Sequence, residues 1–178
     1  MSEQGGAKVG LHFVFLAAIV AALALVSLPG HAAVFDDHDA ARLAQINEAI
    51  QSFEDEVGAT LHHLPRDDAE QIESFSYVKL NLEAAHERLN NVFMLLAVSL
   101  YMEALPDQLL ILNVMHEQLL PRSKNYLNEK KAAIASMAVA HPSNEIFAGY
   151  SARAAVLLGN QAVSLLDELD GKIAALKQ

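Results

Sequence analysis

Residues 75–96 read FSYVKLNLEAAHERLNNVFMLL, and the spacing of the apolar side chains in this stretch decides the fold. An α-helix turns once in about 3.6 residues, so apolar residues three or four positions apart share one face. The positions that follow this spacing are Phe75, Val78, Leu82, Ala85, Leu89, Val92 and Leu96. The stretch therefore predicts a long amphipathic helix that buries one face.

Prolines divide the rest of the chain after residue 34 into segments of the same kind. Each segment carries an apolar stripe at helical spacing. The segments, separated by Pro65, Pro106 and Pro142, are 35–64, 66–105, 107–141 and 143–178.

Helix starts and one interruption can also be predicted. Asp107 and Ser143 each follow a proline and are predicted N-caps, because their side-chain oxygens can accept from the first unpaired N–H groups of a helix. Pro121 lies inside the third segment and is expected to kink or break that helix near Leu120.

The sequence contains no sustained β-branched alternation and no Asn-Gly hairpin signal, which favours an all-α fold. Amphipathic helices joined by very short loops run antiparallel to their neighbours. We therefore predict one domain, residues 34–178, folded as an antiparallel up-down-up-down four-helix bundle.

Residues 1–33 have the composition of a secretory signal peptide. A short polar start with Lys8 precedes an apolar run from Val9 to Leu28, and small residues follow. This order is typical of a leader that is cleaved after Ala32 or Ala33. An uncleaved membrane anchor is the alternative, because about 20 apolar residues can span a bilayer. In both cases the following domain is expected to be periplasmic or secreted, and membrane contact is expected only if the leader is retained.

Composition excludes several classes of function. The chain has no cysteine, so it has no disulfide, thiolate zinc site or iron–sulfur cluster. Its formal charge of −10 argues against nucleic-acid binding, which needs a basic surface. The sequence also lacks a nucleophile elbow, a His-Glu-x-x-His motif and a glycine-rich phosphate loop. We therefore expect no enzymatic activity.

Three histidines are the first candidates for a metal site. His62 and His63 end the first segment and His141 ends the third, and antiparallel packing places all three at one end of the bundle. Imidazole groups can bind zinc, nickel or copper without thiolates. The alternative is that these histidines are solvated and interact favourably with the helix dipoles.

Glu83 and His86 have the Glu-x-x-His spacing that di-iron bundles use. Such bundles need a second motif of this kind, and His116 has Asn113 three residues before it instead. We therefore expect Glu83 and His86 to form a local pair beside the core.

Haem is a further alternative, because four-helix cytochromes hold iron between His and Met side chains. His86 and His116 could serve with one of the methionines of the domain, Met94, Met102, Met115 and Met137. Methionine on an apolar helix face is more often a core residue. We expect no cofactor, and a divalent transition metal or haem is the alternative.

One region is more apolar than a monomeric bundle needs. Residues 92–102, apart from Ser99, and residues 109–112 are apolar all around their helices. This hairpin is either unusually buried, or an interface, or an apolar pocket or membrane-facing tip. The candidate partner surface consists of Phe93, Leu95, Leu100, Leu110 and Ile111.

Together these patterns predict an exported, non-enzymatic bundle that acts as a binding or structural module. A homodimer or another protein partner is expected to use the apolar hairpin of the second and third segments. A metal- or haem-binding bundle for metal handling or electron transfer is the alternative function.

Overall fold

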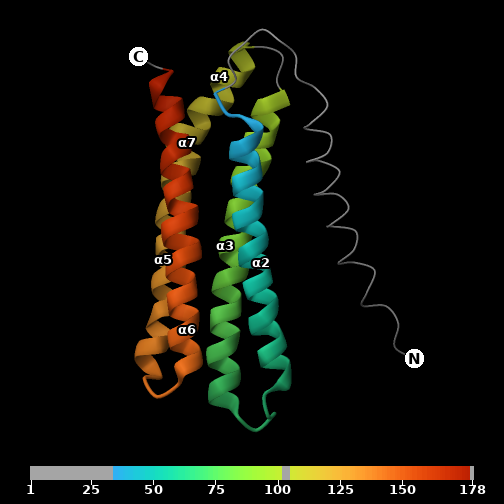
Figure 1. The fold of residues 1–178 in the computed structure, drawn as a ribbon, viewed down its shortest axis with the longest axis vertical. Coiled ribbons are helices and arrows are strands. Elements are labelled where there is room, and N and C mark those ends of the chain that lie inside the picture. The colour runs from blue at the N-terminus through green and yellow to red at the C-terminus, as the bar shows by residue number, and fades with distance from the viewer. Residues whose placement is uncertain (1–33, 102–104, 177–178) are drawn as a thin grey trace, which may run out of the picture.

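The computed structural model describes residues 34–101 and 105–176, which contain helices and no strand (Figure 1). The predicted all-α fold is confirmed. The predicted leader, residues 1–33, lies outside the described residues. The helices are α2 Asp37–His63, α3 Ala69–Tyr101, α4 Leu105–Val114, the π-helix η1 Met115–Leu119, α5 Leu120–Ala140, α6 Glu145–Ala154, the π-helix η2 Ala155–Val163 and α7 Ser164–Ala175.

Within the described residues these helices form four rods that lie side by side (Figure 1). α2 packs on α3, α3 packs on α5, α5 packs on α6 and η2, and η2 packs back on α2. The loops 64–68 and 141–144 lie at one end of the rods, which we call the loop end. The start of α2, the helix α4 and the end of α7 lie at the other, which we call the α4 end (Figure 1). In the described part of the chain, no helix is both long and apolar enough to cross a membrane.

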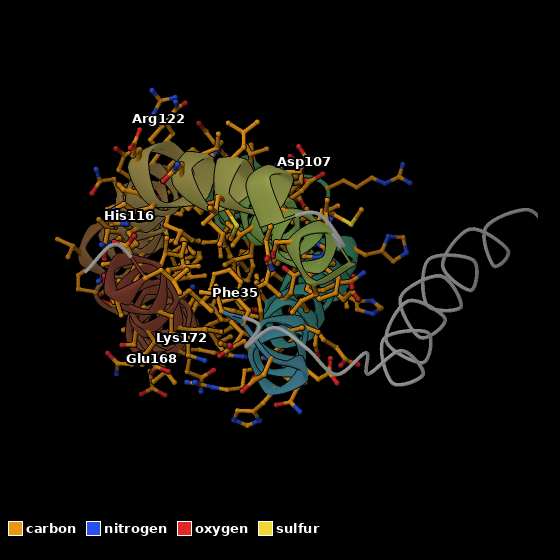
Figure 2. All side chains as sticks on the ribbon, turned by 90° about the horizontal axis from the view of Figure 1, so that it is seen from above. Phe35, Asp107, His116, Arg122, Glu168 and Lys172 are labelled. Carbon is orange, nitrogen blue, oxygen red and sulfur yellow. The ribbon has the colours of Figure 1, made fainter. Side chains whose placement is uncertain are left out.

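A capping box begins α2. The Asp36 carboxylate accepts from the Asp39 N–H at 2.9 Å, and the Asp39 carboxylate accepts from the Asp36 N–H at 3.1 Å. Phe35, directly before this cap, is only 1% exposed and belongs to the core, toward which it points in Figure 2. A buried residue before the cap fixes the angle at which the chain enters the helix. The burial of Phe35 therefore fixes how the chain enters α2.

The structure corrects two predicted helix starts. Asn144, not Ser143, caps α6, because its side-chain oxygen accepts from the Ile146 N–H at 3.0 Å. α4 begins at Leu105, so Asp107 lies in its first turn and is not its N-cap. A carboxylate in the first turn still interacts favourably with the helix dipole.

Pro121 does not break the third rod. Leu119 and Leu120 both keep helical dihedral angles, and the N–H of Leu120 donates to the carbonyl of Met115, five residues back. Proline has no N–H and its ring crowds the carbonyl four residues back, so the wider turn of η1 directly before it accommodates the ring. α4 runs obliquely across the α4 end before α5 turns along α3 (Figures 1 and 2).

The predicted stripe of residues 75–96 is the centre of the core. All seven of its residues are 0% exposed. Leu109 and Leu176 follow the same helical spacing in the segments 107–141 and 143–178, but they are 45% and 50% exposed. Leu112, one turn further along the oblique α4, is only 2% exposed and belongs to the core.

Asn47 is a polar residue in a core position of α2. It is 5% exposed, and its side-chain oxygen has no hydrogen-bond partner. Replacing this side chain by one of similar shape removes an unpaired acceptor from the core, so we expect Asn47→Leu to raise the free energy of unfolding by about 1 kcal/mol. Urea unfolding followed by circular dichroism measures this change.

Asn81→Leu is the matched control. Asn81 is 6% exposed, but its amide donates to the Tyr77 carbonyl at 2.8 Å. We expect the free energy of unfolding to rise less in Asn81→Leu than in Asn47→Leu, because Asn81→Leu removes an existing hydrogen bond. Equal gains would contradict the role given to the unpaired oxygen.

Candidate functional site

The histidines proposed for a metal site lie at the loop end but have different surroundings. His62 and His63 are exposed in the last turn of α2, with ring centroids 5.7 Å apart. His141 is half-buried at the end of α5, where its Nε2 lies 3.0 Å from the Ser74 hydroxyl. Its ring also packs on Phe147, with centroids 5.1 Å apart. His141 thus joins α5 to α3 and α6.

Among residues 34–101 and 105–176, no three His, Cys, Asp or Glu side chains are grouped so that they could hold a metal ion. The Nδ1 atom of His141 lies 3.8 Å from a carboxylate oxygen of Glu70. The metal alternative stays a prediction from the sequence.

Glu83 and His86 lie in a cluster of charged side chains from α2 and α3 that the sequence did not reveal. The Glu54 carboxylate, on α2, lies 2.9 Å from the Lys79 Nζ and 4.0 Å from the His86 Nδ1. Glu83 is half exposed and lies 3.6 Å from the same Lys79. The hydrogen bond to Glu54 raises the pKa of Lys79. His86 therefore faces an acid on the neighbouring rod, and the arrangement joins α2 to α3.

His116 likewise contacts an acid from another rod. Its Nδ1 lies 2.6 Å from the Asp170 carboxylate of α7. Lys124 donates to Asp170 at 3.2 Å and to Asp167 at 2.8 Å. Its pKa is raised, chiefly by the hydrogen bond to Asp167. This cluster joins η1 and α5 to α7.

The methionines considered for haem are placed differently from one another. Met115 is buried in the core, Met137 is partly buried against it, and Met94 is 46% exposed. Met102 lies outside the described residues. Haem binding also stays a prediction.

An ion pair with one fully buried partner joins the first and last helices of the described residues. Asp39 is 1% exposed, and both of its carboxylate oxygens accept from the Lys172 Nζ, at 2.6 and 2.5 Å. One turn along α2, Arg42 donates to Glu168 on the surface; this hydrogen bond raises the pKa of Arg42 and lowers that of Glu168. Figure 2 labels Lys172 and Glu168 on the side of α7 that faces α2.

A polar groove of about 330 Å³ continues from this ion pair along α2 and η2. Amide and hydroxyl groups make up much of its lining. The lining residues are Arg42, Gln45, Ile46, Asn160, Gln161, Ser164 and Glu168. A second open hollow, of about 460 Å³, lies at the loop end and is lined by residues 141–145.

The predicted partner surface is divided between core and solvent. Phe93 is 2% exposed and belongs to the core, which corrects its assignment to the surface. Leu95, Leu100 and Ile111 are partly buried and pack against the core. Only Leu110 is largely exposed, at 65%. α4 crosses this end of the rods, and the residues Phe93, Leu95 and Leu100 of α3 are buried or partly buried there.

Exposed members of the apolar surplus, together with the nearby Val114, lie on the surface of α3 and α4. These residues are 41–65% exposed, and the two helices that carry them contact each other near the α4 end. We call them the α3–α4 surface: Met94, Val98, Leu109, Leu110 and Val114. Only Leu110 of these five belongs to the partner surface predicted from the sequence, because an all-round apolar helix does not show which side will face water. The α3–α4 surface is the candidate functional site.

Comparison of the chain with protein-family models, with curated proteins and with solved structures found no match.

The buried ion pair gives a prediction about stability. Lys172→Met leaves the carboxylate of Asp39 buried without its cation, so we expect the free energy of unfolding to fall by about 3 kcal/mol. Asp39→Asn leaves Lys172, whose side chain is 39% exposed and can be hydrated, so the loss should be smaller. Urea unfolding of both variants measures the difference.

Arg42→Met is the control for this prediction, because Arg42 and Glu168 form an exposed ion pair with side chains 35% and 49% accessible. Such pairs contribute about 1 kcal/mol or less. A loss in Lys172→Met no larger than in Arg42→Met would contradict a structural role for the buried pair.

The cap of α2 gives a prediction about pH. The hydrogen bond from the Asp39 N–H lowers the pKa of Asp36 below its ordinary value of 3.8 in the folded protein. The unfolded chain then takes up this proton at a higher pH than the folded chain. The contribution of Asp36 is therefore present above pH 3.8 and is lost as the pH falls through the lowered pKa.

Asp36→Asn tests this directly, because asparagine is an equally good N-cap that does not titrate. We expect the thermal midpoint of the variant to fall less steeply than that of the original chain between neutral pH and pH below 3.8. If the thermal midpoints of the two proteins fall equally with decreasing pH, the ionisation of Asp36 does not contribute to stability.

Proposed function

We propose that this protein is an exported, non-enzymatic, up-down-up-down four-helix bundle that binds a hydrophobic partner through the α3–α4 surface. The observation that carries the proposal is the exposure of the five large apolar side chains of that surface. The core is already complete without them, since the α3 stripe beside them is fully buried.

The energetics favour an occupant for this surface. Burying apolar surface stabilises a contact by roughly 25 cal/mol per Å². Other exposed apolar side chains, such as Leu80 and Val139, are spread over several helices of the described chain. Single apolar residues on a surface are ordinary, whereas a group on two contacting helices is typical of an interaction site.

The start of the fold supports the export part of the proposal. Phe35 is buried, and the Asp36 cap begins α2 directly after it. The buried Phe35 lies two residues after Ala33 and three after Ala32, the small residues where a signal peptide of this composition would end. This position of the first buried residue and of the α2 cap supports the proposed export.

In water, with no other partner present, the α3–α4 surface should bind a second copy of the chain. We expect the exported protein at micromolar concentration to show a mass above that of one chain by light scattering. Leu110→Glu should restore the mass of one chain, because Leu110 is 65% exposed and a charge there opposes apolar contact without disturbing the core.

Leu80→Glu is the matched control, since Leu80 is 63% exposed in the middle of α3. It should leave the mass unchanged. Leu95 and Ile111 are unsuitable for this test, because they pack against the core and a charge there would also destabilise the fold. A chain that stays monomeric at high concentration, or an equal effect of both variants, would contradict self-association through this surface.

A further inference from the structure

We propose that the occupant of the α3–α4 surface is the zwitterionic phospholipid bilayer in which a retained leader is anchored. This inference rests on the proposed function and names its partner. It takes up the anchor alternative for residues 1–33, whose apolar run from Val9 to Leu28 is long enough to span a bilayer.

The leader joins the domain at the same end as the α3–α4 surface. Phe35 is fixed in the core at the α4 end, and Val34 packs partly against the core (Figures 1 and 2). α4, which carries three residues of the surface, lies at this end (Figure 1). The point of attachment and the apolar side chains therefore lie together.

The connection between the leader and the domain is short. Only residues 29–34 separate the apolar run from Phe35. Six residues span at most about 20 Å when fully extended. A bilayer that holds the apolar run therefore keeps the α4 end within about that distance of its surface, where exposed apolar side chains can enter the interface.

The polarity of the loop end agrees with an orientation in which the α4 end faces the membrane. The loop end exposes Arg66, Asp67 and Glu145, and its loops carry the polar groups of residues 141–144. Such groups are favourable in water and costly at an apolar boundary. The loop end accordingly projects away from the membrane.

The charges at the α4 end define which lipid fits. Asp36, Asp37 and Asp107 are exposed there, and Figure 2 shows Asp107 on the outer side of α4. Anionic headgroups would repel these carboxylates, so contact with lipid must be hydrophobic and not electrostatic. A bilayer of phosphatidylcholine should therefore be contacted more strongly than one containing phosphatidylglycerol.

The absence of tryptophan from the chain allows a direct test. The full chain, with its leader, is reconstituted into phosphatidylcholine vesicles as two single-tryptophan variants. Leu110→Trp reports on the α3–α4 surface, and Val139→Trp reports on the loop end of α5, where Val139 is 81% exposed. Flotation of the vesicles confirms that each chain is anchored, and brominated phosphatidylcholine quenches only tryptophan that touches lipid.

We expect a blue-shifted emission that is quenched by brominated lipid for Leu110→Trp, and an unshifted, unquenched emission for Val139→Trp. Phosphatidylglycerol should reduce the quenching of Leu110→Trp. A chain that does not float with the vesicles, or equal quenching of both variants, would overturn the proposal.

Two further outcomes separate this inference from the proposed function. Emission of Leu110→Trp that shifts with protein concentration but is not quenched by lipid means that a second copy covers the surface. The membrane contact is then wrong and the docking function stands. Emission typical of water, in a chain that is monomeric at every concentration, overturns both.

Discussion

The fold depends on the burial of one apolar stripe, that of α3, between the neighbouring rods. Its seven residues from Phe75 to Leu96 are fully buried, and α3 packs on α2 and α5 along its length. The chain has no cysteine, so no disulfide supports this packing. Hydrophobic burial therefore supplies the main stabilising force, and each of the other rods must present its own stripe to the same core.

Polar contacts at the edges of the core tie the rods to one another. Asp39 and Lys172 join the start of α2 to α7, Glu54 and Lys79 join α2 to α3, and His116 and Asp170 join η1 to α7. These pairs are far apart in sequence, and helical spacing within one segment gives no sign of them. For this reason Glu83 and His86 were predicted as a local pair, whereas the structure places Glu54 of another helix beside His86, and Glu83 beside Lys79.

The α4 end combines two features that separately have ordinary explanations. Exposed apolar side chains are common in small numbers, and an apolar leader is common in exported proteins. Here Phe35, which follows the predicted leader, lies in the core at the end where α4 exposes Leu109, Leu110 and Val114. Their juxtaposition supports a docking surface at this end, and the short connection favours lipid as its occupant.

The sequence by itself determined the all-helical fold, the approximate ends of the helices and the core stripe of residues 75–96, because these follow from local spacing and from prolines. Only the tertiary structure decided that Phe93 is core while Leu110 faces water, since both lie in helices that are apolar on every side. The oblique course of α4 and the π turn before Pro121 set that division. They depend on how rods distant in sequence pack, and a periodic pattern within one segment carries no information about its neighbours.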